Sequence, residues 1–282
     1  MSWVESDYYA FMGYGGDRSR EALGHYVPFF TQAPVLELGS GQGEFLDLLR
    51  DAGLAARGVD VDGGMVEKAR AHGHEVVHCD AVQYLRSVAG GSLGGVFAAH
   101  FLEHFAADEV ARIVAEVARV LRPGGIFVAV VPNAGSLSVL GYDFWRDPTH
   151  VRFYDPQLLA FLATQAGMVV AELGGNPRNS PGPPPQLLPA DLPAEPPLGD
   201  DVARLILDGV GAADSNDHTG RTAPAPAWLA VTHLLGLLDE RLQAVQHQNA
   251  ALRTAYTNLL RHIYPASEVY VVARLAPEEA GP

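Results

Sequence analysis

The stretch Glu37-Leu38-Gly39-Ser40-Gly41-Gln42-Gly43 decides the fold of this chain. It continues the apolar run Pro34–Leu38 and leads into a helical pattern over Gly43–Ala52. A strand that turns into a helix through alternate glycines is typical of the first unit of an α/β sheet, because glycine permits positive φ and lets a ligand touch the backbone. We therefore expect a ligand-binding loop over residues 39–43.

The positions of the glycines distinguish between two kinds of cofactor. A nicotinamide-type loop would place its third glycine at position 44, which is Glu44 here, whereas this chain has Gly43. Glu37 precedes the loop, and a carboxylate there suits a ligand with an ammonium group better than one with a pyrophosphate.

Short β-rich runs alternate with helical patterns from about residue 34 to 174, which predicts a parallel sheet with helices on both faces. The predicted strands are Pro34–Leu38, Ala56–Val61, Glu75–His78, Gly95–Ala99, Ile126–Val131 and Met168–Leu173. The predicted helices are Gly43–Ala52, Gly64–His72, Ala107–Leu121 and Pro156–Gln165. The Pro and Gly residues of Leu121–Gly125 predict a helix end and a turn into the next strand.

Two further acids stand where predicted strands end. Asp60, with Val61 beside it, follows Gly41 by nineteen residues and can hold both hydroxyls of a ribose. Asp80, followed by Ala81, closes the third strand and can accept a hydrogen bond from an exocyclic amine. The loop and both acids, in this order, predict a nucleoside-containing cofactor.

These motifs resemble those of class I S-adenosylmethionine-dependent methyltransferases over roughly residues 30 to 175. The resemblance implies that Glu37, Gly39, Ser40, Gly41 and Gly43 lie against the methionine part of the cofactor. It also implies that Asp60 binds the ribose and that Asp80 and Ala81 contact the adenine. In that family a seventh, antiparallel strand pairs with the sixth, and Ser267–Leu275 matches it. We expect a Rossmann-like seven-stranded sheet with an insertion before its last strand.

The chain divides into five predicted parts. They are an N-terminal lid over 1–30, the cofactor-binding core over 31–174, a Pro-rich insertion over 175–226, a long helix over 227–264, and the last strand and tail over 265–282. Nine prolines between Asn176 and Leu198 exclude a regular helix or a central strand there. Asp200–Val210 is compatible with a short helix.

The long helical segment carries a heptad pattern. Apolar residues and one amide recur with spacings of three and four at Leu235, Leu238, Leu242, Val245, Asn249, Leu252, Tyr256, Leu259 and Ile263. Asn249 occupies an a position, where a buried amide often fixes the register. This pattern predicts a homo-oligomer through a coiled coil, and the alternative is a helix packed within its own chain.

Composition narrows the partners and the compartment. The formal net charge is -14, and no Lys/Arg cluster offsets it, which argues against nucleic acid as a partner. The N-terminus lacks the basic and apolar parts of a signal peptide, and no apolar run is long enough to span a membrane. The single cysteine, Cys79, excludes a disulfide within the chain. We expect a cytoplasmic protein.

The acceptor side of the site is expected at the end of the fourth strand, in His100-Phe101-Leu102-Glu103-His104, and in the later loop that contains His150. An alcohol needs a base or a metal ion to become a nucleophile. We predict Glu103, His104 and His150 as catalytic residues and His100 as a cofactor contact. Tyr14, Trp145, Arg152 and Tyr154 are predicted to bind the substrate, and Tyr14 with Arg18 and Arg20 belongs to the segment that could close over the cofactor.

Glu103, His104 and His150 are also similar to the divalent-metal site of ubiquinone-pathway and small-RNA-end methyltransferases. Those proteins have a glutamate where this chain has His100. The resemblance implies Mg²⁺ or Mn²⁺ at these residues, although the histidine-rich set suits Mg²⁺ less well. If His100 faces the cofactor instead, a weaker site for Mg²⁺ remains.

A second resemblance links this chain to methyltransferases found with glycan-assembly enzymes. It depends on Tyr14–Arg20, Gly95–His100 and Asp147–Arg152, and it implies a sugar hydroxyl as the acceptor. The alternatives are a small-molecule O- or N-methyltransferase of secondary metabolism and a non-catalytic cofactor-binding scaffold in a glycan-assembly complex.

Overall fold

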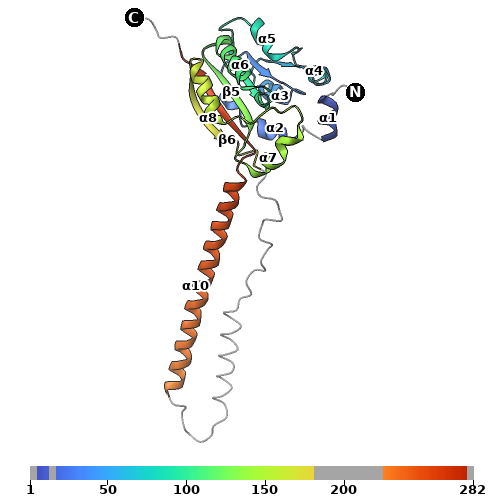
Figure 1. Ribbon diagram of the computed structural model, residues 1–282. Coiled ribbons are helices and arrows are strands. Elements are labelled where there is room, and N and C mark those ends of the chain that lie inside the picture. The colour runs from blue at the N-terminus through green and yellow to red at the C-terminus, as the bar shows by residue number, and fades with distance from the viewer. Residues whose placement is uncertain (1–4, 13–16, 181–224, 278–282) are drawn as a thin grey trace, which may run out of the picture. The chain divides into compact units, whose positions relative to one another are not determined.

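The computed structural model describes residues 5–12, 17–180 and 225–277 of the chain, which is drawn in Figure 1. These residues fall into two compact units, Met1–Gly182 with Ile263–Pro282 and Pro183–His262. Most of the predicted Pro-rich insertion, including the helix expected at 200–210, lies outside the described residues, and so does Tyr14.

The described residues of the first unit form one seven-stranded sheet in the order β3-β2-β1-β4-β5-β7-β6. Its strands are β1 (Val35–Leu38), β2 (Ala56–Asp60), β3 (Val76–His78), β4 (Leu93–Ala99), β5 (Leu121–Pro132), β6 (Met168–Gly175) and β7 (Glu268–Leu275). β1 to β5 pair in parallel, and β7 pairs antiparallel with both β5 and β6. The predicted Rossmann-like sheet, with an insertion between its last two strands in sequence, is confirmed.

Helices and 3₁₀ turns connect the strands. The helices are α1 (Glu5–Met12), α2 (Asp17–Leu23), α3 (Glu44–Asp51), α4 (Gly63–Ala71), α5 (Ala81–Ser87), α6 (Ala107–Val120), α7 (Leu137–Gly141), α8 (Pro156–Gln165) and α10 (Ala225–Ile263). The 3₁₀ turns are η1 (Val27–Phe29), η2 (Leu102–His104) and η3 (Asp143–Arg146).

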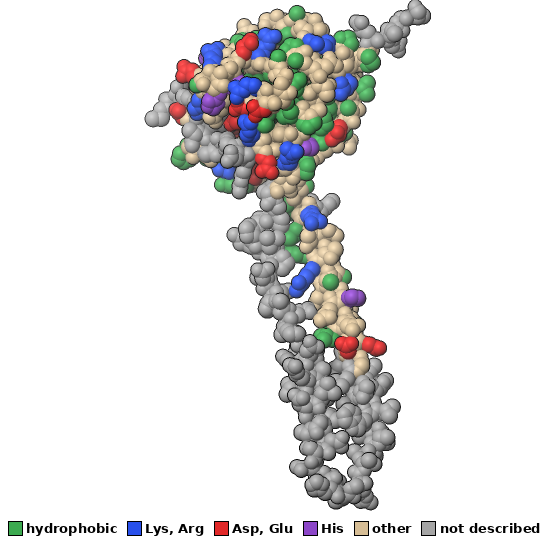
Figure 2. Space-filling view, turned by 180° about the vertical axis from the view of Figure 1, so that it is seen from behind, with side chains coloured by type: hydrophobic (Ala, Val, Ile, Leu, Met, Phe, Trp, Pro, Cys, Tyr) green, Lys and Arg blue, Asp and Glu red, His purple; other side chains and the backbone are tan. Residues whose placement is uncertain are grey.

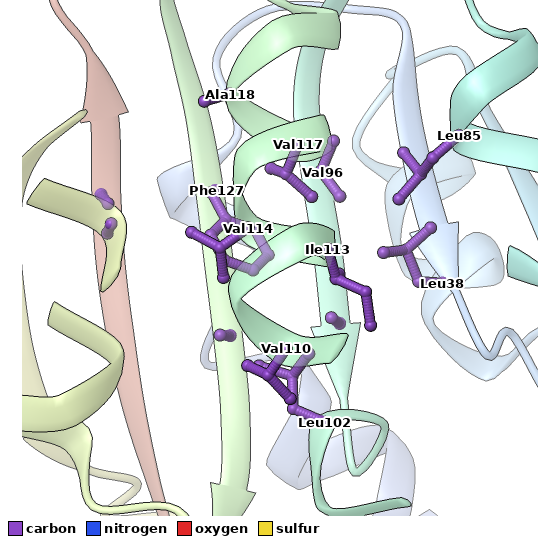
Figure 3. Close-up of a cluster of buried hydrophobic side chains, with 14 of the residues drawn as sticks. Leu38, Leu85, Val96, Leu102, Val110, Ile113, Val114, Val117, Ala118 and Phe127 are labelled. Carbon is purple, nitrogen blue, oxygen red and sulfur yellow. The ribbon is translucent and has the colours of Figure 1, made fainter. Parts of the chain in front are cut away.

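The larger hydrophobic cluster packs helices α5, α6 and α8 against one face of the sheet. Figure 3 shows Val110, Ile113, Val114 and Val117 projecting from α6 toward the strands. These positions recur every three or four residues, so they form one buried stripe on a helix of fourteen residues. The stripe explains why the sequence pattern predicted this helix correctly.

The other face of the sheet is covered by α3 and by the segment around η1. Along β4, Val96 and Ala98 belong to the first cluster, whereas Phe97 belongs to the second. This alternation follows from the two-residue period of a strand. Tyr26 and Phe30 are also buried in the second cluster, so part of the segment predicted as a lid is core.

Two local predictions differ from the structure. α5 was not predicted, because its seven residues are too short to show a clear helical period. The predicted turn over Leu121–Gly125 is part of β5, since Leu121 pairs with Leu93 before a register shift leads to the pair Gly95–Ile126. The Gly-rich segment is therefore an irregularity within a strand.

The second unit contains the helix α10, which matches the long helix predicted over 227–264. It is the longest helix in the described part of the chain, at 39 residues. Among the described residues, no helix combines the length and the apolar character needed to cross a bilayer.

Candidate active site

A cavity of about 520 Å³ lies in the first unit, where strands β1 and β4 end. β1 lies between β2 and β4 in the sheet. The chain leaves β1 and β4 toward opposite faces of the sheet, since α3 follows β1 on one face and α6 follows β4 on the other. Ligands of open α/β sheets bind at such a switch point. The cavity is lined by the glycine loop, the end of β4, the region of α7 and η3, and α2, through residues that include Gly39, Ser40, Gly41, His100, Asp147, His150, Ser19 and Leu23.

The glycine loop adopts a backbone that side chains disfavour. Gly39, Gly41 and Gly43 have φ values of 68°, 51° and 91°. A Cβ atom at Gly43 would lie 2.8 Å from His74 Cδ2, so this position is crowded as well as left-handed. The loop thus keeps its shape only with glycine, and Ser40 beside it is buried with a hydroxyl that lacks a hydrogen-bond partner.

Glu37 places a buried carboxyl group at the cavity wall. Its side chain is 5% exposed, and its Oε2 atom has no hydrogen-bond partner. Burial, followed by the negative charges of Glu44 and Asp60, raises the pKa of Glu37 well above its usual value. A buried acid without a partner is costly. The position therefore suits a cationic ligand group that would supply the missing charge.

Asp60 is tied to the glycine loop. Its Oδ2 accepts a hydrogen bond from the Gly41 amide at 2.8 Å, and its Oδ1 accepts one from the Asp62 amide at 2.8 Å. Burial raises the pKa of Asp60, while these amide hydrogen bonds act to lower it. Asp60 thus links the end of β2 to the loop after β1, although it does not line the cavity itself.

The remaining predicted cofactor residues follow the neighbouring strands. Val61 is 66% exposed after β2. Asp80 is exposed and caps the N-terminus of α5, where its Oδ1 accepts a hydrogen bond from the Gln83 amide at 2.8 Å. Ala81 is buried in the first turn of that helix. β2 lies next to β1 and β3 next to β2, all in parallel, so these residues end on the cofactor side without lining the cavity.

The structure brings Glu103, His104 and His150 together. One possible ligand atom from each residue lies within 4.8 Å of the other two. Glu103 is fully buried, and neither carboxylate oxygen has a hydrogen-bond partner. Its backbone carbonyl accepts a hydrogen bond from the Val151 amide at 2.8 Å, which fixes the His150 loop against η2. The prediction that these distant residues share a site agrees with this arrangement.

The two histidines differ in their surroundings. His150 lines the cavity, and its Nδ1 lies 2.6 Å from the Phe144 carbonyl oxygen. If Nδ1 donates this hydrogen bond, Nε2 keeps a free lone pair. His104 lies behind it, with Nδ1 at 2.9 Å from Thr149 Oγ1 and Nε2 at 3.2 Å from the His100 carbonyl oxygen. His150 is therefore better placed than His104 to contact a bound molecule.

His100 lies between two carboxylates. Its Nε2 is 2.9 Å from Glu268 Oε2, and its Nδ1 is 3.4 Å from Glu103 Oε1. Although the side chain is 47% exposed, desolvation by the surrounding residues acts to lower the pKa of His100, but these two acids outweigh it and raise the pKa to about 10. Burial likewise acts to raise the pKa of Glu268, but hydrogen bonds from His100, Tyr26 and Asn176 lower it to about 2. This arrangement favours an ion pair at the edge of the cavity.

The predicted substrate residues are dispersed. Trp145 is 67% exposed and donates a hydrogen bond from Nε1 to the Leu140 carbonyl at 2.9 Å. Tyr154 is buried and donates to the Phe105 carbonyl at 2.8 Å, with the Arg152 guanidinium 5.0 Å above its ring. None of these three residues lines the cavity. Instead, Asp143, Phe144 and Arg146 line it between α7 and the His150 loop.

Sequence reasoning missed Glu268 and its partners. Tyr26 Oη and Asn176 Nδ2 each lie 2.6 Å from Glu268 Oε1, and Asn179 Nδ2 lies 2.6 Å from Oε2. The available signal was a single acid at the start of the apolar run of β7. Its partners stand up to 242 positions away, so no local pattern could identify them.

Acidic and basic side chains are interspersed over the visible face of the first unit in Figure 2. No continuous basic surface is seen on that face among the residues described. This distribution agrees with the mixed charges of the sequence, in which acids outnumber bases.

Comparison with known proteins agrees with this site. Residues 36–129 match the family model of a methyltransferase domain. A probable S-adenosylmethionine-dependent methyltransferase of Mycolicibacterium smegmatis is 32% identical over 143 residues, which are 50% of this chain and 54% of that protein. The match therefore spans about half of this relative's length.

Solved structures share the fold. An S-adenosylmethionine-dependent methyltransferase from Archaeoglobus fulgidus superposes with a TM-score of 0.64 and 22% identity, over 94% of this chain and 99% of that chain. A phosphoethanolamine N-methyltransferase from Haemonchus contortus, solved with S-adenosylhomocysteine, gives 0.50 and 16%, over 94% and 53%. Residues 36–129 thus match the family model of a methyltransferase domain, the chain shares the Rossmann-like fold of these methyltransferases, and the family supports S-adenosylmethionine as the cofactor.

The ion pair between Glu268 and His100 predicts that stability depends on pH. The contribution of Glu268 is present above its usual pKa of 4.5 and is lost as the pH falls toward 2. The contribution of His100 is complete below its usual pKa of 6.5 and is lost as the pH rises toward 10. We expect Glu268→Gln to lower the free energy of unfolding most between pH 4.5 and 6.5.

Urea unfolding of wild type and Glu268→Gln at about pH 5.5 and about pH 9 measures this effect. The difference between the two proteins should be smaller at the higher pH. An equal difference at both pH values would contradict the ion pair.

Proposed function

We propose that this chain, whose residues 36–129 match a methyltransferase domain, transfers a methyl group from S-adenosylmethionine to a hydroxyl group of a saccharide or glycan. The observation that carries the proposal is the buried, unpartnered Glu37 oxygen beside the glycine loop, in a cavity that His150 also lines. Glu37 can bind a cationic cofactor group, and His150 can accept the proton of an acceptor.

The charges of the cavity support this cofactor. When bound, S-adenosylmethionine supplies a methyl group on a positively charged sulfonium. Acidic lining residues, namely Glu37, Glu44, Asp143 and Asp147, outnumber the cationic ones, His100 and Arg146. An excess of negative charge favours a ligand with an ammonium and a sulfonium group. In this proposal Glu37 binds the ammonium group, Asp60 holds the ribose from the end of β2, and Asp80 with Ala81 faces the adenine.

His150 is the proposed base. The hydrogen bond from its Nδ1 to the Phe144 carbonyl fixes the ring and leaves Nε2 able to accept a proton. The transfer would form a bond between the acceptor oxygen and the methyl carbon and break the bond between that carbon and sulfur, whose electron pair stays on sulfur. The hydroxyl proton would pass to His150 Nε2, so atoms and charge balance. The His104 ring packs beside the His150 ring, with ring centroids 4.8 Å apart, and supports its orientation.

A sugar hydroxyl is the favoured acceptor for two reasons. The cavity includes the polar side chains of Asp143, Asp147, Asn179 and Ser267, which can bind several hydroxyl groups. The stretch Asp147–Arg152 also resembles that of methyltransferases associated with glycan assembly. Trp145 and Arg152 lie outside the cavity, where they could contact a longer saccharide.

Two alternatives make different predictions. A small-molecule O- or N-methyltransferase would methylate phenols or amines in preference to saccharides. A non-catalytic scaffold would bind the cofactor and transfer no methyl group to any acceptor. Assays with labelled cofactor and matched panels of saccharides, phenols and amines distinguish the three functions.

The acidic balance and the single cysteine support a cytoplasmic setting and an acceptor that is not a nucleic acid. The proposal therefore includes a cytoplasmic location and an acceptor other than a nucleic acid.

His150→Ala and His104→Ala are each expected to lower kcat at least about 100-fold, because general base catalysis typically contributes about 10² to 10⁴. Cofactor affinity, measured by calorimetry, should change little. His72→Ala is the matched control, since His72 is an exposed histidine at the end of α4. Wild-type turnover in either variant would refute the assignment.

A divalent cation at Glu103, His104 and His150 is an alternative to the histidine base, because Nε2 of His150 cannot bind a metal ion and accept a proton at the same time. The orphaned carboxylate of Glu103 and the free Nε2 of His150 fit a metal ion, and the hydrogen bond to Phe144 would orient the histidine ligand. Such an ion would lower the pKa of an acceptor hydroxyl. His100 is already a cationic neighbour of Glu103, so the buried carboxylate does not require a metal ion to offset its charge. Metal binding is therefore tested separately from base catalysis.

In this alternative, exhaustive chelation should abolish activity, and Mn²⁺ or Mg²⁺ should restore it. Calorimetry should detect Mn²⁺ binding to the wild type and at least about tenfold weaker binding to Glu103→Gln. Full activity after chelation, or equal binding by both proteins, would remove the metal from the mechanism.

A further inference from the structure

We propose that Glu268 is a positioning residue for His100, so that the first residue of β7 determines the shape of the cavity at the end of β4. The proposal rests on the methyl-transfer function above, because it assigns the His100 ring a place beside the reacting groups. Glu268 itself does not line the cavity.

Glu268 is anchored more firmly than a single ion pair requires. The side chain is 3% exposed. Its Oε1 accepts from Tyr26 and Asn176, and its Oε2 accepts from Asn179 and His100. A carboxylate has about four lone-pair sites, and four donors occupy them here. The group is thus held from η1, from the chain after β6 and from the end of β4.

His100 needs such an anchor. Among the described non-glycine residues it is the one with positive φ, at 50°. Its side chain is 47% exposed and lines the cavity. A residue in this backbone region persists only where its surroundings hold it. Glu268 and Glu103 supply that constraint, since each faces one nitrogen of the ring.

This geometry also limits what His100 can do. Because both ring nitrogens face carboxylates, neither is free to take a proton from an acceptor. The ring instead forms part of the cavity wall beside Ala99 and Pro132. If the anchor were removed, the ring could turn into or away from the cavity, and small displacements of an aligned site reduce turnover strongly.

The test compares Glu268→Gln with Tyr26→Phe. Tyr26→Phe removes one donor to Glu268 but leaves the contact with His100 in place. We expect Glu268→Gln to lower kcat at least about tenfold and to change the dissociation constant of S-adenosylhomocysteine by a similar factor. Tyr26→Phe should lower thermal stability and leave both constants within about twofold.

Glu268→Asp separates position from charge and replaces Glu268→Gln if that variant does not fold. It keeps the carboxylate but withdraws it by one methylene, so it should show the same loss of kcat. Wild-type kcat and affinity in a folded Glu268→Asp or Glu268→Gln protein would overturn the proposal. If the wild type methylates no acceptor, the proposed function fails, whereas the affinity for S-adenosylhomocysteine still tests the positioning.

A different observation carries a second inference, which concerns α10. We propose that α10 pairs with α10 of a second copy of this chain as a parallel, in-register coiled coil. Within the part of the heptad seam whose side chains the structure describes, the paired surface comprises Leu242, Val245, Asn249, Leu252, Tyr256, Leu259 and Ile263. Within it, Val245, Leu252 and Leu259 are 52%, 67% and 54% exposed. Three large apolar side chains along one stripe favour burial against a partner.

Asn249 argues for a second copy as that partner. In a parallel, in-register pair each a residue packs against its own equivalent, so the two Asn249 amides can donate and accept hydrogen bonds reciprocally. In an antiparallel pair, a positions face d positions, and Asn249 would face an apolar residue. Leucine at d positions such as Leu252 and Leu259 is compatible with two strands.

The flanking charges are compatible with this register. The side chains that would lie beside the seam in a parallel pair are Arg241 opposite Gln246 and Gln248 opposite Arg253 of the second copy. No like charges meet in these two pairs. The parallel arrangement is therefore free of the electrostatic repulsion that would oppose self-association there.

Light scattering of the full chain should give twice its mass of 30.1 kDa. The double variant Leu252→Glu, Leu259→Glu should give the single mass, because four charges would be buried in the pair. In a Cys79→Ser background, Asn249→Cys should form a disulfide-linked dimer on oxidation. Thr254→Cys, on the outer side of the heptad, is the matched control and should not.

A monomeric wild type at tens of micromolar would contradict self-pairing and would favour a partner within the same chain for the seam. Equal cross-linking of the two cysteine variants would contradict the register.

Discussion

The parallel pairing of β1 with both β2 and β4 is the constraint on which the site depends. Val35 pairs with Ala56 on one side and with Gly95 on the other, so both neighbours extend in the same direction as β1. The turns after β1 and β4 therefore meet at one edge of the sheet. At that edge the loop residues Gly39–Gln42 and the side chain of His100 line one cavity.

The close packing at the start of β4 maintains this pairing. A Cβ atom at Gly94 would lie 2.4 Å from the Gln32 carbonyl oxygen, and one at Gly95 would lie 2.5 Å from Phe30 Cδ1. Gly94 and Gly95 thus allow the start of β4 to lie close to the segment that precedes β1. The strand β1 is buried along its whole length, as expected for a parallel strand covered on both faces. Glu37 is the one ionisable residue of that strand, and its carboxyl group is buried at the cavity without a partner for Oε2.

The fold and the cofactor side could be predicted from the sequence because their signals are local. Strand, glycine loop and helix follow one another within residues 35–51, and Asp60 has the expected distance from them. The predicted meeting of Glu103 with His150 agrees with the structure, since both follow strands that end at the same edge. Trp145, Arg152 and Tyr154 lie off the cavity because a loop's residue types do not show which side chains pack the loop against the core.

The buried network around Glu268 could not be predicted from local pattern. It joins residues from just before η1, just after β4, the chain after β6, and β7. Its existence depends on how the last strand enters the sheet between β5 and β6. This network also brings residues from both sides of the insertion to the site. The residues on both sides of the insertion, Asn179 and Ser267, line the cavity.

The central claim is that Glu37 makes this cavity a site for a cationic nucleoside cofactor. Calorimetric titration of S-adenosylmethionine into wild type, Glu37→Gln and the exposed control Glu75→Gln tests it most directly. A charge-assisted hydrogen bond contributes about 1.5–3 kcal/mol, so Glu37→Gln should bind at least about tenfold more weakly, while Glu75→Gln binds like the wild type. Equal affinity of all three proteins, or no binding by the wild type, would contradict the claim.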